Sequence, residues 1–367
     1  MNILYDHYIF STQKYGGISR YFYELITRLS EKPDAGIALF MGLHISKYGL
    51  EDYRNRFNRF FGVSRPEIPR TIKIFTLINS LILPGFANKS CIDIYHQTYY
   101  TRYLPRFNGA RIVTVHDMIH ELYPQYLSAH KTVSALKKWS VERAAGIICV
   151  SQSTKRDLIE IFNVPEEKIR VIYHGNSLVI DPGLLPEIKD PYILYVGQRG
   201  GYKNFRLLLE AYAKSPVVNS NFKLICFGGG PMQSEELMFI KETGIAGKIL
   251  WHSGPDRLLA NLYKYAAAFI YPSLYEGFGF PPLEAMHYGC PVVVSNRSSI
   301  PEVVGKAGLY FEPAKLDDLI VKLEKILSDG DLRKQLINFG YEQEAKYSWD
   351  KCAEETYKLY KDTLNTR

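Results

Sequence analysis

The chain has 367 residues, 46% of them hydrophobic and 23% charged, which is more than one hydrophobic core usually accommodates and predicts two domains. Its net charge of +7 suits an anionic small molecule, an acidic membrane surface or a nucleic acid, and does not choose among them. The five cysteines are widely spaced and form no C-x-x-C pair, which excludes a recognisable disulfide framework or zinc motif and predicts buried, reduced thiols.

The first residues and the most apolar stretch bear on where the protein acts. Met1 to Asp6 reads as a strand and lacks the basic start and apolar core of a signal peptide. The apolar stretch from Ile74 to Phe86 is interrupted by Asn79, Ser80 and Pro84, and it is too short to span a bilayer. Together with reduced thiols, these features predict a cytoplasmic protein.

Short apolar runs alternate with amphipathic helical runs along the chain, which is typical of parallel α/β architecture. The strand-like runs of the first half are Ile3–Tyr5, Ile37–Phe40, Ile92–Tyr95, Ile112–Val115, Ile147–Val150 and Ile169–Tyr173. Those of the second half are Tyr192–Val196, Leu224–Phe227, Ile249–His252, Phe269–Tyr271, Val292–Ser295 and Leu309–Phe311. A proline-containing linker over Ser177 to Asp190 separates the halves. We expect domains at residues 1–180 and 190–345, and a helical tail at 346–367 that packs across both.

The stretch from Lys47 to Lys73 mixes two residue classes and leads directly into the apolar run. Its basic members are Lys47, Arg54, Arg56, Arg59, Arg65, Arg70 and Lys73, and its aromatic members are Tyr48, Tyr53, Phe57, Phe60 and Phe61. One interpretation is a peripheral surface for anionic lipid headgroups or a lipid-linked acceptor, at the inner face of the membrane. The other is a solvated helical face followed by a core helix.

Three segments of the first half place glycine or polar residues at the end of a predicted strand or at the start of a predicted helix. Tyr15 to Arg20 opens the first predicted helix with Gly16 and Gly17, and Arg20 either guides an anion or faces solvent. His116 and Asp117 follow a strand; such a pair, taken alone, is more often structural than functional. The hydroxyls of the Val150–Lys155 segment are expected to cap a helix.

Two loops of the second half carry charge or glycine. The segment from Pro191 to Tyr212 reads strand–loop–helix and places Arg199 and Lys203 in its loop. Fixed cations there would stabilise a leaving diphosphate more in the transition state than in the ground state. A second loop, Phe227 to Pro231, contains three consecutive glycines and could equally be an ordinary tight turn.

The segment from Tyr271 to Met286 is the most informative. A strand ends at Tyr271, a glycine loop follows, and Pro281 and Pro282 stand where a helix begins. The free backbone N–H groups of a helix start favour a diphosphate. Two carboxylates, Glu276 and Glu284, bracket the loop and suit the hydroxyls of a sugar and a ribose.

This segment resembles the E-x7-E signature of glycosyltransferase family 4, a family of retaining enzymes, and the resemblance extends along nearly the whole chain. The family has the GT-B fold, which implies two Rossmann-like domains facing a central cleft and a C-terminal helix crossing back to the first domain. The resemblance also implies a nucleotide-diphosphate sugar as co-substrate, with no cofactor and no metal.

The resemblance assigns roles to individual residues. Four are implied as catalytic contacts: Arg199 and Lys203 on the diphosphate, Glu276 on the sugar, and His116 reaching the sugar from the first domain. The implied substrate contacts are Gly16, Gly17, Asp117, Gly197, Gly229, Gly230, Gly277, Phe278, Gly279, Phe280, Leu283 and Glu284. One departure is visible: His174-Gly175-Asn176 stands where many relatives have an Asn-Gly pair.

Other catalytic motifs are missing. The one D-x-D match, Asp329-Gly330-Asp331, lies between two helical runs and reads as a helix start rather than a metal site. The G-x-G-x-x-G dinucleotide fingerprint is not met, because Phe280, Pro281 and Pro282 follow Gly279. Neither a G-x-x-x-x-G-K-[ST] phosphate loop nor a G-x-S-x-G nucleophile motif occurs.

We therefore expect a metal-independent, retaining hexosyltransferase of polysaccharide synthesis, with a saccharide or lipid-linked acceptor and no nucleic-acid partner. UDP-glucose or a similar UDP-hexose is the favoured donor, and GDP-mannose is the alternative. The resemblance implies front-face displacement, in which the leaving phosphate oxygen takes the acceptor proton. The rivals are a phosphorylase or epimerase on the same fold, a non-catalytic nucleotide-sugar-binding protein, and a nucleic-acid binder.

Overall fold

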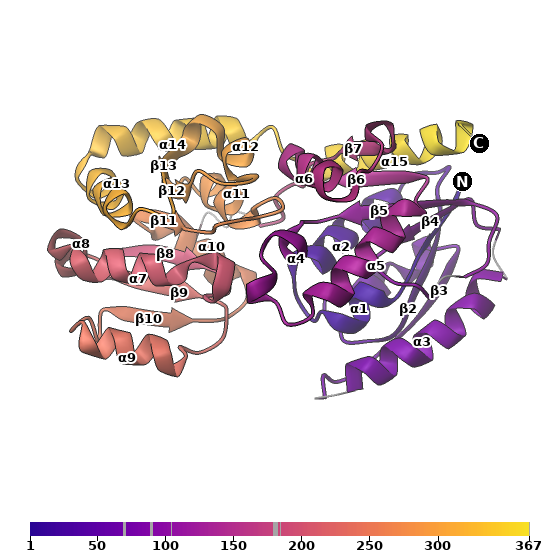
Figure 1. Cartoon of the computed structure of the whole chain (residues 1–367), viewed down its shortest axis with the longest axis horizontal. Coiled ribbons are helices and arrows are strands. Elements are labelled where there is room, and N and C mark those ends of the chain that lie inside the picture. The colour runs from indigo at the N-terminus through magenta and orange to yellow at the C-terminus, as the bar shows by residue number, and fades with distance from the viewer. Residues whose placement is uncertain (69–70, 89–90, 104, 179–182, 184, 367) are drawn as a thin grey trace. The chain divides into compact units, whose positions relative to one another are not determined.

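Two compact α/β units make up the chain in the computed structural model (Figure 1), which describes residues 1–367 apart from 69–70, 89–90, 104, 179–182, 184 and 367. Unit 1 comprises residues 1–175 with the segment from Ser348 onward, and unit 2 comprises residues 176–347. Every strand pairing among the described residues is parallel. The prediction of two Rossmann-like domains is confirmed.

Unit 1 is built on a seven-stranded sheet, as far as the described residues extend, in the order β3-β2-β1-β4-β5-β6-β7. Its strands are β1 (Asn2–Tyr5), β2 (Gly36–His44), β3 (Arg59–Ser64), β4 (Ile94–Gln97), β5 (Ala110–Val115), β6 (Gly146–Cys149) and β7 (Ile169–Val171). Its α-helices are α1 (Tyr8–Thr12), α2 (Gly17–Leu29), α3 (Thr71–Asn88), α4 (Ile119–Leu122), α5 (His130–Glu142), α6 (Gln152–Phe162) and α15 (Trp349–Asn365). Short 3-10 helices are η1 (Leu50–Arg56), η2 (Pro124–Tyr126) and η3 (Glu166–Lys168).

Helix α15 brings the end of the chain onto the sheet of unit 1. Its Tyr360 hydroxyl lies 2.9 Å from the hydroxyl of Tyr5 on β1 and 2.5 Å from Nδ1 of His96 on β4, and all three side chains are fully buried. Figure 1 shows α15 beside β6, which is far from it in the sequence. The expected return of the C-terminal helix to the first domain is therefore confirmed.

Unit 2 is built on a second sheet, six-stranded over the described residues, in the order β10-β9-β8-β11-β12-β13. Its strands are β8 (Tyr192–Val196), β9 (Lys223–Phe227), β10 (Ile249–His252), β11 (Ala268–Tyr271), β12 (Val292–Ser295) and β13 (Gly308–Phe311). Its α-helices are α7 (Phe205–Lys214), α8 (Pro216–Asn221), α9 (Ser234–Glu242), α10 (Asp256–Tyr265), α11 (Phe280–His287), α12 (Ile300–Val304), α13 (Leu316–Ser328) and α14 (Gly330–Glu344). The 3-10 helices η4 (Gly201–Lys203) and η5 (Gly305–Ala307) complete it.

Predicted and observed elements agree wherever strands are buried on both faces, since such strands read as continuous apolar runs. Two helix-start predictions are also confirmed: the side chain of Ser151 caps α6, and that of Asp329 caps α14. The prediction that all five thiols are buried is wrong for one, because Cys91 is exposed.

Strand β3 (Arg59–Ser64) lies within the basic and aromatic stretch for which a solvated helical face was one of two interpretations. Aromatic side chains of this stretch pack in part against unit 1, and Phe61 remains 36% exposed. Phe61 of β3 stacks on Phe40 of β2 at 5.5 Å between ring centroids, and Phe57 is only 8% exposed. The helical interpretation is wrong over Arg59–Ser64, because this edge strand shows no regular alternation of buried and exposed residues that would have marked it as a strand.

Helix α3 differs from the other described helices in its combination of length and apolar composition. Among the described residues it is the one helix long and apolar enough to cross a membrane, by length and composition only, and 22% of it is buried. Its buried members are Asn79, Leu83, Phe86 and Ala87. Helix α3 thus contributes to the core on one side only, and most of it is not buried as the alternative of a core helix requires.

Asn79 anchors α3 to β2. Its Oδ1 accepts from the backbone N–H of Leu43 at 2.8 Å, and its Nδ2 donates to the Leu43 carbonyl and to Oγ of Ser11, both at 3.0 Å. Gly42, with φ +59°, brings the β2 backbone against this amide, since a Cβ there would lie 2.3 Å from Oδ1. The buried amide thus fixes where α3 crosses the sheet.

We predict that Asn79→Ala lowers the free energy of unfolding by about 2–3 kcal/mol, because it removes three buried hydrogen bonds and leaves their partners unsatisfied. Urea unfolding followed by circular dichroism measures the change. The exposed Asn55→Ala on η1 serves as control and should shift stability by less than about 0.5 kcal/mol. Equal effects of the two substitutions would contradict the anchoring role.

Candidate active site

Three loops of unit 2 leave the carboxyl ends of adjacent strands β9, β8 and β11. Strand β8 lies between β9 and β11, and the chain builds the sheet outward from β8 through β9 to β10 before it returns to β11 on the other side. The carboxyl ends at such a reversal form the usual ligand-binding crevice of a parallel sheet. The predicted donor-binding residues of the second half lie on these loops or on α11.

An ion pair joins the β8 and β11 loops. Nζ of Lys203 lies 2.7 Å from Oε1 of Glu276, with the two side chains 15% and 10% exposed. The Tyr271 ring lies 5.6 Å beneath the ammonium group, and its hydroxyl is 3.5 Å away. A nearly buried ammonium beside a carboxylate and an aromatic face is a site in which a further anion can be held.

Two serines after β12 hold the glycine loop in place, and the sequence did not single them out. Oγ of Ser298 accepts from the Glu276 N–H at 2.8 Å and donates to its carbonyl at 3.0 Å. Ser299 Oγ donates to the Glu276 and Phe278 carbonyls, both at 2.9 Å. The signal that could have found them is a pair of hydroxyls just before the helix that follows a parallel strand.

Helix α11 starts as predicted. Gly279 has φ +101°, Phe280 is the first helical residue, and prolines occupy the first turn. Prolines cost nothing there, because the first N–H groups of a helix have no intrahelical partner. Leu283 is fully buried and Phe278 is 4% exposed, so at these positions the backbone is better placed to meet a ligand than the side chain.

Glu284 lies on the buried side of α11 and is 5% exposed. Its Oε2 accepts from the hydroxyl of Tyr263 on α10 at 3.0 Å. The two carboxylates of the E-x7-E pattern therefore have different partners, an ammonium for Glu276 and a phenol for Glu284.

Arg199 is bound to the neighbouring glycine loop rather than facing open space. Its guanidinium donates to the carbonyls of Gly228 at 3.0 Å, Gly230 at 2.8 Å and Pro231 at 2.7 Å. Its Nε pairs with Oε1 of Glu236 on α9 at 2.9 Å, and the residue is 7% exposed. In this structure Arg199 fixes the shape of the loop after β9.

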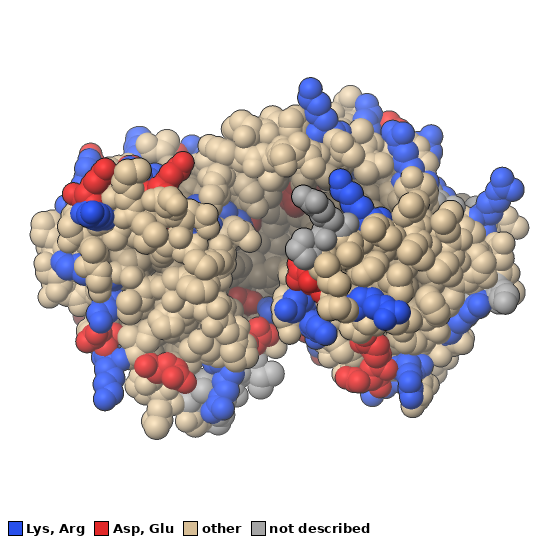
Figure 2. Space-filling model, turned by 90° about the horizontal axis from the view of Figure 1, so that it is seen from below, with Lys and Arg blue, Asp and Glu red and all other residues tan. Residues whose placement is uncertain are grey.

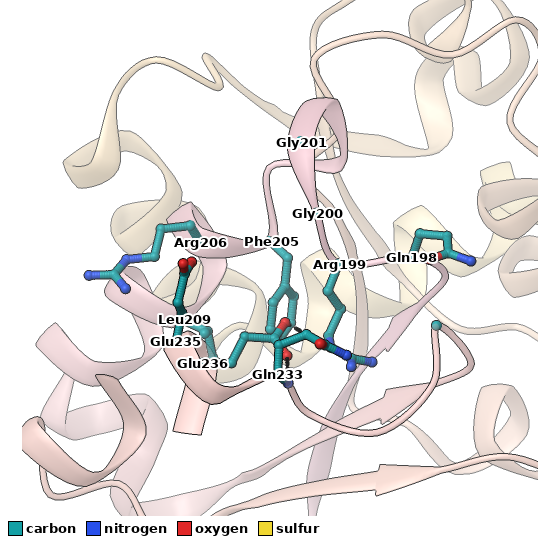
Figure 3. A pocket seen from close by; sticks show the side chains of 11 residues that line it. Gln198, Arg199, Gly200, Gly201, Phe205, Arg206, Leu209, Gln233, Glu235 and Glu236 are labelled. Carbon is teal, nitrogen blue, oxygen red and sulfur yellow. Dashed lines mark hydrogen bonds and ion pairs between the residues drawn. The ribbon is translucent and has the colours of Figure 1, made fainter. Parts of the chain in front are cut away.

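A cavity of about 600 Å³ opens beside this loop (Figure 3). Its lining residues are Gln198, Arg199, Gly200, Gly201, Phe205, Arg206, Leu209, Gly229, Gln233, Glu235 and Glu236. In Figure 3 Arg199 extends toward Glu236 alongside the ring of Phe205. Glycine is required at position 229, because its φ is +68° and a Cβ would lie 2.5 Å from the carbonyl of Gly197. Gly197 and Gly230 also have positive φ, at 129° and 77°.

His116 follows β5 in unit 1 and is 9% exposed. Its ring lies 5.4 Å from that of Tyr21 on α2 and 6.3 Å from that of His174. Burial lowers the pKa of His116 to about 4, against the raising effect of Asp117 and with a further lowering by Lys137. The neutral imidazole has a buried Nε2 that makes no hydrogen bond within the described part of the chain. Such a nitrogen is suited to a substrate hydroxyl.

The side chain and carbonyl of Asp117 make contacts within unit 1 that order the chain around it. Its Oδ1 accepts from the Ile119 N–H at 3.1 Å, at the start of α4. The buried ammonium of Lys137 lies 3.8 Å from the same oxygen, donates to the Asp117 carbonyl at 2.8 Å, and pairs with Glu121 at 2.7 Å. These contacts order the chain that follows His116.

The remaining predicted glycines of unit 1 start α2. Gly16 precedes Gly17, the first helical residue, and its carbonyl accepts from the hydroxyls of Ser19 at 3.1 Å and Tyr48 at 3.3 Å. At His174-Gly175 the glycine has a packing reason, since a Cβ on Gly175 would lie 2.2 Å from the backbone nitrogen of Trp349.

Unit 1 contains its own cavity of about 530 Å³. It is lined by aromatic, hydroxyl and cationic side chains together with two apolar ones: Tyr8, Thr76, Tyr100, Thr101, Arg102, Tyr103, Lys131, Thr132, Ala135 and Leu136. Aromatic faces with hydroxyls suit a saccharide, and the two cations suit a phosphate. The sequence did not identify this set, because its members come from four separate segments.

The described residues contain no group of three or more His, Cys, Asp or Glu side chains that could hold a metal ion. Asp329 of the D-x-D match caps α14 through the Leu332 N–H at 2.9 Å.

Comparisons with known proteins cover most of the chain. Residues 15–178 match the model described as Glycosyltransferase Family 4, and residues 180–343 match that of Glycosyl transferases group 1. O-antigen chain mannosyltransferase B of Escherichia coli is 32% identical over 283 residues, which are 73% of this chain and 74% of that protein.

Two further proteins illustrate the range of the likeness. A Campylobacter jejuni enzyme, N-acetylgalactosamine-N,N'-diacetylbacillosaminyl-diphospho-undecaprenol 4-alpha-N-acetylgalactosaminyltransferase, is 32% identical over 197 residues, 51% of this chain and 52% of that protein. The structure of sucrose-phosphate synthase from Thermosynechococcus elongatus superposes with a TM-score of 0.78 over 100% of both chains at 20% identity, which shows the GT-B fold.

We predict that unit 1 loses stability as the pH falls below 6.5. Burial lowers the pKa values of His7 and His116 to about 4 and that of His96 to about 3. These groups are neutral when folded and take up protons on unfolding between pH 6.5 and about 4, so their contribution is complete above pH 6.5 and lost toward pH 4.

The slope of unfolding free energy against pH, from urea titrations, measures this proton uptake. At pH 5, His116→Gln should unfold with about one proton less taken up than the native chain. The exposed Gln125→Ala, which removes no titratable group, is the control and should leave the slope unchanged. An unchanged slope in His116→Gln would show that this imidazole is not buried in the neutral form.

Proposed function

The chain belongs to glycosyltransferase family 4, and we propose that it is a retaining hexosyltransferase that moves a hexose from a nucleotide-diphosphate sugar to a saccharide acceptor in polysaccharide synthesis. The observation that carries this proposal is the ion pair of Lys203 and Glu276 at the reversal of the unit 2 sheet, beside the glycine loop that starts α11. A cation, a carboxylate and a helix start converge there from two loops.

The proposed role of Lys203 and the start of α11 is to hold the donor diphosphate. The bond between the anomeric carbon and the diphosphate oxygen breaks in the reaction, and negative charge grows on the departing phosphate. A fixed ammonium and the N–H groups of a helix start oppose that charge without reorganising, so they stabilise the transition state most. These groups supply the positive charge that a metal provides elsewhere, which is why we propose that no metal is needed.

Glu276 is the proposed contact for the donor sugar, with the backbone of Phe278 and Gly279. When a diphosphate takes the ammonium of Lys203, the Glu276 carboxylate can accept from sugar hydroxyls instead. The serine hydroxyls that hold its backbone keep the carboxylate in position. Glu284 remains the proposed ribose contact from α11. In the proposed front-face reaction the leaving oxygen takes the acceptor proton, so positioning replaces a protein nucleophile.

Arg199 has a different proposed role from the one that its charge suggests. The sequence assigned it to the diphosphate, but its donors are engaged by three carbonyls and Glu236. We propose that it acts as a positioning residue that shapes the 600 Å³ cavity for the nucleotide base. Gly229 and Gly230 then present backbone to that base.

The names of the relatives bear on which nucleotide sugar is the proposed donor. The Escherichia coli protein is named a mannosyltransferase, which favours the GDP-mannose alternative over the UDP-glucose expectation. The cavity of unit 1 is the proposed acceptor site, because its tyrosines, threonines, Arg102 and Lys131 suit a saccharide joined to phosphate. The lipid diphosphate in the name of the Campylobacter jejuni enzyme agrees with an acceptor of this kind.

A donor-turnover assay tests the proposal. Purified protein is incubated with GDP-mannose or UDP-glucose in EDTA, with and without short mannose oligosaccharides, and released nucleotide and products are quantified. We expect release from one donor and retention of the anomeric configuration in any product.

Lys203→Ala should reduce the rate of nucleotide release at saturating donor at least about 100-fold, because it removes the fixed cation at the leaving group. Lys214→Ala, exposed at the end of α7, is the control and should keep the native rate. An unchanged rate in Lys203→Ala would overturn the assignment. Release that requires orthophosphate, or isomerised donor without transfer, would instead identify a phosphorylase or an epimerase.

A further inference from the structure

An apolar stripe covers the outer face of α3. Its members are Ile74 (55% exposed), Leu77 (55%), Ile78 (36%), Leu81 (74%) and Ile82 (42%). They recur at the i, i+3, i+4, i+7, i+8 spacing that places side chains on one helical face. Single exposed leucines are ordinary, but an unbroken stripe of this kind on a soluble protein marks a surface that meets an apolar partner.

The stripe contains no charge to keep it in water. Lys73 is the one charged residue of α3, at its amino-terminal end, and none follows it through Asn88. Phe61 and Ile68, which precede α3, add further exposed apolar surface at 36% and 50%.

The opposite face of α3 is firmly attached to unit 1. Asn79 makes its three hydrogen bonds with β2 and α1, and Leu83 and Phe86 pack in a core cluster with Leu4 and Phe40. The Arg59 guanidinium donates to the Phe86 carbonyl at 2.8 Å and lies 4.4 Å from the centre of its ring. A helix held on one side with an apolar stripe on the other is built to lie along a surface rather than to cross it.

The charge near α3 indicates which surface this is. Residues 47–88 contain seven Lys or Arg and three Asp or Glu, and Arg54, Arg65 and Lys73 are exposed. Seen from below, the side on which α3 lies in Figure 1, unit 1 shows a broad tan area with more blue than red at its margin (Figure 2). Basic groups beside an apolar stripe match anionic lipid headgroups above hydrocarbon. Pairing of two copies through this face would bring like charges together.

We propose that the apolar face of α3 inserts into the interfacial layer of an anionic lipid bilayer, while Arg65 and Lys73 contact the headgroups. The inference rests on the proposed function, since Thr76 of α3 also lines the cavity assigned to the acceptor. A lipid-linked acceptor would then reach that cavity from the membrane to which α3 is bound.

Vesicle flotation tests this proposal with the full chain. The probes are vesicles of phosphatidylcholine alone and of phosphatidylcholine with 30% phosphatidylglycerol. We expect binding to the anionic vesicles that weakens at high salt. Leu77→Gln/Leu81→Gln should reduce the partition coefficient at least about tenfold, because two exposed leucines lose their burial in lipid.

The matched control is Leu237→Gln/Val321→Gln, which removes two side chains of similar exposure, 54% and 57%, from helices of unit 2. It should bind vesicles like the native chain. No flotation of the native chain, or equal flotation of both double variants, would overturn the membrane assignment. So would a native dimer, measured by light scattering, that becomes monomeric in the α3 variant, because the partner would then be a second copy. Donor turnover in detergent-free solution is assayed in parallel, so failure of the membrane proposal is distinguishable from failure of the proposed function.

Discussion

The ion pair between Lys203 and Glu276 joins two loops that leave adjacent strands of the unit 2 sheet but lie 73 residues apart in the chain. A parallel sheet brings such loops together only where the strand order reverses, so the pair depends on the fold and marks the place where it can bind a ligand. Neither partner is held by the pair alone: Ser298 and Ser299 fix the backbone of Glu276, and Tyr271 lies beneath Lys203. The ammonium of the pair is therefore already in position to bind an incoming diphosphate.

The two basic residues of the β8 loop have different roles at that site. Lys203 faces a carboxylate that an anion could displace, whereas Arg199 is committed to three carbonyls of the loop after β9 and to Glu236. A bound diphosphate competes easily with one ion pair and poorly with four directed hydrogen bonds. Helix α3 also has one engaged side and one uncovered side, because Asn79 and Phe86 hold one face against unit 1 and leave the apolar stripe outward.

The sequence predicted the strands of both sheets well, because strands buried on two faces appear as continuous apolar runs. It also predicted the start of α11, since glycine followed by two prolines permits few other structures. It could not show that the donors of Arg199 are already engaged, or that Ser298 reaches back to Glu276, because both depend on contacts between segments far apart in the chain. The edge strand β3 was missed, because its residues show no regular strand pattern. The sequence left open whether α3 faces outward or lies in the core, because composition does not tell which side of an apolar helix is covered.

Thermal unfolding with UDP, GDP and ADP, each in EDTA and in magnesium, tests most directly the claim that this chain holds a nucleoside diphosphate without a metal. A ligand that binds only the folded chain raises the melting temperature by mass action. We predict that one nucleotide raises it equally in both conditions, that Lys203→Ala abolishes most of the increase, and that Lys214→Ala leaves it intact. No increase with any nucleotide, or an increase only in magnesium, would contradict the account.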